Sequence, residues 1–121
     1  MIIKTLTENT ARADRLACAH ALSLYIEALG HRLLFDTGAS PLFIENASLL
    51  GVDLAAVEFV ILSHGHYDHG GGLKAFLELN DRAEIFVHSR AFGDYYVKRR
   101  NGELLFIGIE EELKASRQIV L

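Results

Sequence analysis

The sequence contains one cysteine, one proline and no tryptophan, and no apolar run in it reaches membrane-spanning length. Because Cys18 is the only cysteine, no disulfide can form within the chain, and a reducing cytoplasm is the expected compartment. The first residues lack the charged and apolar regions of a signal peptide. These absences predict a soluble cytoplasmic protein that does not associate with a membrane.

Acidic residues outnumber basic ones by 16 to 12, which gives a net charge of −4 and an isoelectric point near 5.8. This balance argues against nucleic acid as the main partner. A local basic run, residues 98–100, is typical of a solvated turn, and the functional alternative is a clamp for a substrate phosphate. Half of the 121 residues are hydrophobic, so we expect one domain over residues 1–121 that buries a core.

One stretch carries most of the chemistry. Residues 59–62 are consecutively apolar, as in a strand that is covered on both faces. Four metal-ligand side chains follow within six residues: His64, His66, Asp68 and His69. The glycines that permit tight turns in this loop are Gly65, Gly70, Gly71 and Gly72. The pattern predicts a metal site at the carboxyl end of a buried strand, and the alternative is a polar loop with histidines by chance.

The spacing of these ligands suggests two adjacent metals. In an extended segment His64, His66 and Asp68 project from one edge, and His69 faces a neighbouring position. Imidazoles with a carboxylate suit zinc first, with iron or manganese as alternatives. Two such metals can share a hydroxide that acts as the nucleophile, and we expect Asp68 to help orient it as a catalytic group.

Several segments together resemble a known family. They are Leu6-Thr-Glu-Asn-Thr10, Leu34-Phe-Asp-Thr-Gly38, Phe43-Ile-Glu-Asn46 and Ser63-His-Gly-His-Tyr-Asp-His69. The last is similar to the signature of the metallo-β-lactamase-fold hydrolases, and the set resembles their dihydropterin ribofuranosylaminobenzene phosphate synthase-like subgroup, over the N-terminal half only. The resemblance implies an α/β fold, half of a four-layer αββα sandwich. It also implies a metal-dependent hydrolase with a small-molecule substrate, which is either a phosphorylated pterin-like compound or another anionic one. The histidine at position 66 favours hydrolysis over oxygen reduction, since the redox branch carries glutamate there.

Further residues are candidates for the surroundings of the metals. Asp36 follows a predicted strand and is expected to orient a metal-bound histidine rather than to bind metal itself. In the family the loop that holds Glu8 and Asn9 lies beside the metals, so these two either line the pocket or bond to their own turn. His88 ends another predicted strand and is either an extra ligand or a hydrogen-bonded histidine at a strand end. His20 and His31 are interpreted as ordinary polar residues at strand ends.

The periodicity predicts a mixed, largely antiparallel sheet with helices on one face. The expected strands cover residues 1–6, 21–28, 32–35, 59–62, 84–88, 104–109 and 118–121. A loop is expected over residues 7–19, helices over 40–50 and 72–80, and a helical turn over 110–115. Asp53 is expected to cap a further turn over residues 54–57. Residues 91–96 are either an aromatic pocket wall or a short helix.

The predicted strands at residues 33–35 and 59–62 are apolar on both faces, while the expected helices cover only one. We therefore expect a homodimer or a complementary second-half chain to cover the other face. The motif supplies four ligands where two catalytic metals need about six. Enzymatic activity is expected if a partner or second copy completes the site, and the alternative is a truncated metal-binding or interaction module that has no activity by itself.

Overall fold

The computed structural model describes residues 1–9 and 20–121. Its strands are β1 (Ile2–Thr7), β2 (Ser23–Ala28), β3 (His31–Phe35), β4 (Phe59–Ile61), β5 (Glu84–Phe86), β6 (Tyr96–Lys98), β7 (Leu104–Phe106) and β8 (Ile119–Val120). Its helices are α1 (Leu42–Leu49), α2 (Tyr67–Gly70) and α3 (Leu73–Leu79), with the 3-10 turns η1 (Leu54–Ala56) and η2 (Glu111–Ala115). Most of the loop expected over residues 7–19 lies outside the described residues, as does Cys18.

Six described strands form one mixed sheet in the order β1-β2-β3-β4-β5-β8. The pairs β1-β2 and β2-β3 are antiparallel, whereas β3-β4, β4-β5 and β5-β8 are parallel. The expectation of a largely antiparallel sheet is therefore wrong. Hairpin signals in a sequence reveal antiparallel neighbours, but parallel neighbours are joined by helical crossovers that leave no local signal of strand direction. The mixed sheet with helices on one face is confirmed.

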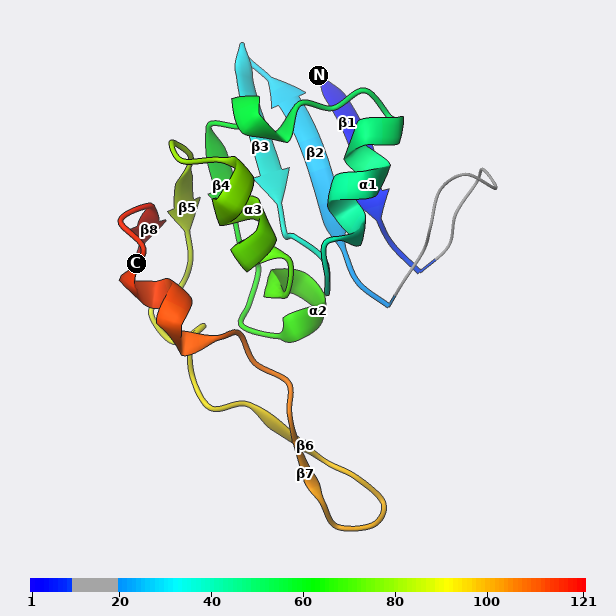
Figure 1. The fold of residues 1–121 in the computed structure, drawn as a ribbon, viewed down its shortest axis with the longest axis vertical. Coiled ribbons are helices and arrows are strands. Elements are labelled where there is room, and N and C mark those ends of the chain that lie inside the picture. The colour runs from blue at the N-terminus through cyan, green and yellow to red at the C-terminus, as the bar shows by residue number, and fades with distance from the viewer. Residues whose placement is uncertain (10–19) are drawn as a thin grey trace.

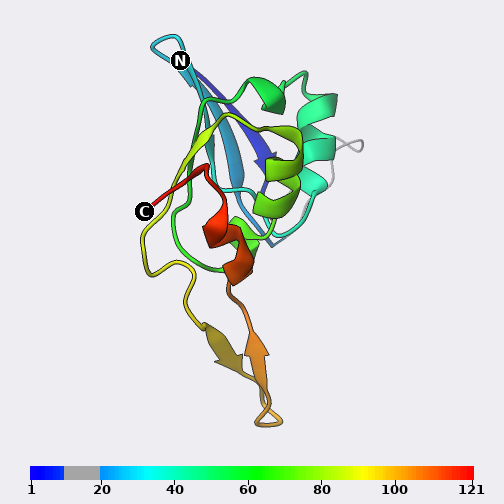
Figure 2. The same ribbon diagram turned by 60° about the vertical axis from the view of Figure 1, so that its left-hand side comes forward.

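The helices α1 and α3 lie on the same side of the sheet (Figures 1 and 2). Their inward side chains, Phe43, Ala47, Leu73 and Phe76, pack into one buried cluster with strand residues. The strand residues in this cluster are Leu6, Tyr25, Leu34, Val60 and Ile85. Asp53 caps η1, as the sequence predicts, by accepting a hydrogen bond from the amide of Ala55 at 3.1 Å. Burial of this cluster holds the helical layer against the sheet.

The opposite face of the sheet carries apolar side chains that remain in contact with solvent. Ile61, Phe86 and Val120 stand opposite one another across three parallel strands, and each is 38–39% exposed. Phe59 lies two residues before Ile61 and therefore on the same face, and its ring centroid is 6.3 Å from that of Phe86. On β1, Ile3 is 56% exposed. We call this surface, defined by Ile3, Phe59, Ile61, Phe86 and Val120, the open face.

The strands β6 and β7 form a separate antiparallel hairpin that projects from the body of the molecule (Figure 1). Its exposed apolar side chains are Tyr96, Val97, Leu104, Leu105 and Phe106. A helix was one expectation for residues 91–96, but residues 91–95 are a turn and an irregular segment that lead into β6 at Tyr96. Within the described part of the chain, no helix is long and apolar enough to cross a membrane.

Candidate metal centre

The ends of two parallel strands bring the central residues of the site together. Phe35 and Ile61 are register partners at the carboxyl ends of β3 and β4. Because neighbouring parallel strands end at the same edge of a sheet, Asp36 meets Ser63 directly after them. The amide of Ser63 donates to Asp36 Oδ1 at 2.7 Å, and the Ser63 hydroxyl donates to Asp36 Oδ2 at 2.7 Å.

Asp36 also holds His69. The side chain of Asp36 is fully buried, and its Oδ2 lies 2.7 Å from Nδ1 of His69. Its backbone has a φ of +58°, a left-handed conformation that aspartate tolerates better than most residues. When Nδ1–H donates to this carboxylate, Nε2 of His69 keeps its lone pair for another partner. The contact has the geometry expected of an acid that orients a ligand.

His64 is arranged in a similar way. Its Nδ1 lies 2.8 Å from the hydroxyl of Ser63. Because that hydroxyl donates to Asp36, it accepts from Nδ1–H of His64, which leaves Nε2 of this ring available as well. Burial, followed by the neighbouring rings of His69 and His66, holds the pKa of His64 below its ordinary value. The neutral imidazole, the form that binds metals, is therefore favoured.

The next part of the motif differs from the expected extended segment. Tyr67–Gly70 is a short helix, α2, and His66 occupies its N-cap position. The alternation argument is therefore wrong for Asp68 and His69, because the amide of His69 bonds to the carbonyl of His66 in a helical turn. The helix nevertheless converges on His64: donor atoms of His64, Asp68 and His69 all lie within 4.8 Å of one another.

This donor set fits a divalent metal. Two imidazoles and a carboxylate are the mixed nitrogen and oxygen ligands that zinc, iron and manganese accept. Ligands on one zinc with bonds of about 2.0–2.2 Å lie roughly 3–4 Å apart, so small side-chain movements convert the observed spacing into a coordination shell. His66 stands outside the group of three, but its ring centroid is 4.7 Å from that of His64.

Residues that follow β5 form one wall of the centre. A side chain at Gly65 would overlap the carbonyl of Ala91, so only glycine permits this close approach. The ring of Tyr95 lies edge-on to His66, with centroids 5.7 Å apart, and its hydroxyl donates to the carbonyl of Arg90 at 2.6 Å. Tyr95 is thus an aromatic neighbour of the motif, and a pocket wall over residues 91–96 stays a prediction.

Three other predicted site residues lie outside the group of three. His88 is exposed at a turn, and its Nδ1 accepts from the amide of Arg90 at 3.1 Å, as expected for the hydrogen-bonded alternative. Glu8 and Asn9 are exposed just after β1. Their place in the pocket stays a prediction.

Sequence reasoning missed two neighbours of the motif. No role of its own was predicted for Ser63, although its hydroxyl links Asp36 to His64. His20 was interpreted as an ordinary polar residue, yet its Nε2 lies 3.5 Å from Oδ2 of Asp68. No local signal identifies His20, because the contact joins segments that are distant along the chain.

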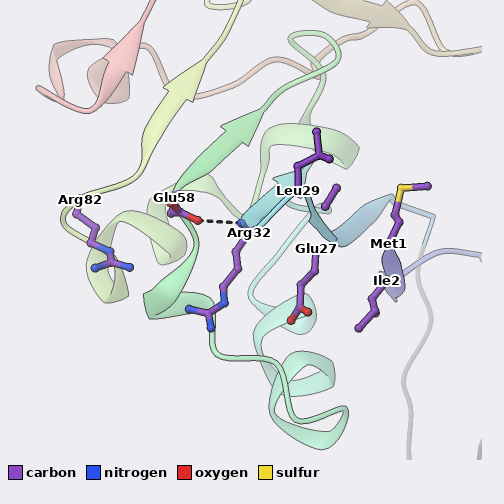
Figure 3. A pocket seen from close by; sticks show the side chains of 9 residues that line it. Met1, Ile2, Glu27, Leu29, Arg32, Glu58 and Arg82 are labelled. Atoms are coloured by element: carbon purple, nitrogen blue, oxygen red, sulfur yellow. Dashed lines mark hydrogen bonds between the residues drawn. The ribbon is translucent and has the colours of Figure 1, made fainter.

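Two cavities differ in their relation to this centre. One of about 570 Å³ surrounds the β2-β3 turn, at the opposite end of β3 from Asp36 (Figure 3). Its charged groups include Glu58, whose pKa is lowered by the hydrogen bond from the amide of Arg32 and by His31. The other, of about 270 Å³, adjoins α2 and is lined in part by Tyr67, Lys74 and Glu110. The second cavity is therefore the one next to the motif.

Fold, motif and donor geometry agree with comparisons to known proteins. The profile of the family described as "Metallo-beta-lactamase superfamily" matches residues 18–105. The chain belongs to this superfamily, and its fold corresponds to part of the metallo-β-lactamase fold.

Individual relatives refine this placement. An uncharacterised protein of Methanocaldococcus jannaschii is 37% identical over 115 residues, which are 93% of this chain and 42% of the relative. The 7,8-dihydropterin-6-methyl-4-(beta-D-ribofuranosyl)-aminobenzene-5'-phosphate synthase of the same organism is 39% identical over 80 residues, 60% of this chain and 27% of that protein. The resemblance inferred from the motifs is thus confirmed.

Solved structures give the same result. A crystal structure described as a metal-dependent hydrolase of the beta-lactamase superfamily is 29% identical, with a TM-score of 0.73, and the match covers 98% of this chain and 41% of that one. A subclass B3 metallo-beta-lactamase of Bradyrhizobium japonicum shares the fold, at 23% identity and a TM-score of 0.54, over 74% of this chain and 37% of that one. The chain spans less than half the length of these relatives.

Proposed function

We propose that this chain provides the metal-binding half of a metal-dependent hydrolase. The observation that carries the proposal is the convergence of His64, Asp68 and His69 within 4.8 Å, in a member of the metallo-β-lactamase superfamily. His66 adjoins the group and completes the four ligands of the motif. Alternation along an extended segment placed His64 with His66 and Asp68, whereas the structure groups His64 with Asp68 and His69.

The four side chains would hold two divalent metals, with zinc as the first choice and iron or manganese as alternatives. A metal bound in such a site acts as a Lewis acid and makes water a nucleophile near neutral pH. The chain's own contribution is orientation. Asp36 holds Nδ1 of His69 and Ser63 holds Nδ1 of His64, which leaves Nε2 of each ring available for a metal, and the ring of Tyr95 packs edge-on to His66.

The substrate class proposed is a small anionic molecule, phosphorylated and pterin-like. One relative is named for a dihydropterin phosphate product, which supports this class. Lys74 places a cation in the cavity beside α2, where it lies 4.0 Å from Glu110. The ring of Tyr67 lines the same cavity and offers a surface on which a flat heterocycle can stack.

Asp68→Asn is expected to lower the rate of hydrolysis by about 100-fold or more, because the amide loses the negative charge that binds metal and accepts a proton. Folding is expected to change little, since Asp68 is half-buried and lies outside the apolar core, and asparagine keeps its size. The measurement is a panel of phosphodiester and lactone substrates, together with a thermal melt. Full activity in Asp68→Asn, in a preparation whose unaltered form is active, would contradict the proposal.

A second function has its own support. The chain spans 42% of its M. jannaschii relative, and the motif supplies fewer ligands than two catalytic metals need. A metal-binding or interaction module without activity by itself is the alternative. Metal analysis combined with the same substrate panel separates the two, because the module binds metal but hydrolyses none of the substrates.

The open face indicates where a partner that completes the metal site could bind. Three of its exposed apolar side chains, Ile61, Phe86 and Val120, lie on the neighbouring strands β4, β5 and β8, as in a sheet that packs against another sheet. We propose that a second copy of this chain covers it, and a separately encoded second-half chain is the rival. Stacking sheet on sheet would bury the apolar surface and bring a second set of motif residues into the same assembly.

Sedimentation velocity at micromolar concentration is expected to give a dimer. Phe86→Glu, which places a charge in the centre of the open face, is expected to shift the chain to monomer. The matched control is Phe106→Glu, at a similarly exposed phenylalanine on the projecting hairpin, which should leave the dimer intact. A stable, well-folded monomer of the unaltered chain would refute the dimer.

A further inference from the structure

His20 lies beside the motif because the backbone holds it there. The amide of Leu22 donates to the carbonyl of Asp68 at 3.2 Å, and the carbonyl of Leu22 accepts from the amide of Gly38 at 2.9 Å. These two bonds fix the start of β2 between the motif and the end of β3. His20, two residues before Leu22, therefore reaches the carboxylate of Asp68.

The distance between the two side chains is informative. Nε2 of His20 lies 3.5 Å from Oδ2 of Asp68, which is longer than an N–H···O hydrogen bond of about 2.7–3.2 Å. Two ligands on one tetrahedral zinc, with bonds of about 2.0–2.2 Å, stand roughly 3.3–3.5 Å apart. Nε2 of His69 lies at the same 3.5 Å from Oδ2 of Asp68. The oxygen thus faces two imidazole nitrogens at ligand-to-ligand spacing.

An ion pair explains this arrangement less well. The side chain of His20 is 77% exposed, and an exposed ion pair of this kind contributes little or nothing measurable to stability. A metal ion bound by both His20 and Asp68 would stabilise the imidazole beside the carboxylate more strongly than the ion pair does. An exposed ligand is also free to turn by the small amount that coordination requires.

We propose that His20 is a further metal ligand, which binds the divalent ion held by Asp68 and extends the donor set beyond the four residues of the motif. The inference rests on the proposed metal site, and it adds one imidazole to a motif that is short of ligands for two ions. His20 is not a member of the group of His64, Asp68 and His69, and the contact that links it to the group is the one with Oδ2 of Asp68.

The test uses Zn²⁺ alone and the full 121-residue chain in its native oligomeric state. His20→Ala is expected to weaken zinc binding by about tenfold or more in a calorimetric or competition titration. The matched control is His31→Ala: His31 is also an exposed histidine beside a carboxylate, 3.3 Å from Glu58, but it lies at the opposite end of β3. This control is expected to bind zinc as the unaltered chain does.

A second measurement does not depend on a variant. In ¹⁵N NMR spectra of the unaltered chain, Nε2 of His20 is expected to shift on addition of Zn²⁺ as a coordinated imidazole nitrogen does, and that of His31 is not. Unchanged zinc affinity in His20→Ala would overturn the proposal. So would a His20 Nε2 chemical shift that stays the same on addition of Zn²⁺ while those of the motif histidines change. If the chemical shifts of the motif histidines also stay the same, the proposed metal site itself is wrong. Failure of the His20 proposal can therefore be distinguished from failure of the proposed metal site.

Discussion

Replacing His64 and His66 together with alanine is expected to abolish stoichiometric metal in the purified chain. His64 belongs to the group of three donors within 4.8 Å, and His66 adjoins it. Removal of both imidazoles leaves Asp68 and His69 of the motif, with exposed His20 as the one further donor proposed above, and this set is expected to hold zinc or iron too weakly to survive dialysis against a chelator. The measurement is elemental analysis after dialysis against a weak chelator, with the metal-to-chain ratio falling from one or two to near zero.

The control for this double variant is His31→Ala combined with His88→Ala. Both histidines are exposed, and each bonds locally, to Glu58 and to the amide of Arg90. The control should retain the metal content of the unaltered chain. Metal content that stays the same in the His64 and His66 variant would overturn the assignment of the motif.

Asp36→Asn is expected to have the second largest effect, because it changes both stability and metal affinity. The buried carboxylate accepts hydrogen bonds from the amide and hydroxyl of Ser63 and faces Nδ1 of His69. An amide keeps the size and tolerates the positive φ, but its NH₂ group cannot accept from Ser63 or His69. We expect a loss of about 1–3 kcal/mol in the free energy of unfolding and of roughly 10–100-fold in zinc affinity.

Asp53→Asn is the matched control. Asp53 caps η1 from an exposed position, and asparagine caps helices about as well as aspartate. Denaturant unfolding and zinc titration of both variants, side by side, check the prediction. Equal zinc affinity in the Asp36 and Asp53 variants would mean that Asp36 serves the fold alone.

The candidate metal ligands of the motif could be predicted because they lie close together along the chain, between residues 64 and 69. Val60 is buried at the centre of β4, and the ligands follow the strand within one loop. The hairpin of β2 and β3 could be predicted for the same reason, since Gly30 lies in the turn between two apolar runs. The prediction failed where local preference was overridden: Asp68 and His69 lie in a helical turn, not in an extended segment.

By itself, the sequence determined which candidate ligands are available, that a buried strand is followed directly by the loop that holds them, and that the central strands are apolar on both faces. The tertiary structure alone decided that Asp36 and Ser63 orient His69 and His64, and that His20 reaches Asp68. The physical reason is the separation along the chain of the residues that interact. Strand and turn preferences act between residues that are close along the chain. The orientation of each imidazole instead depends on parallel strand pairing and on the contact of β2 with the motif, which join residues far apart in sequence.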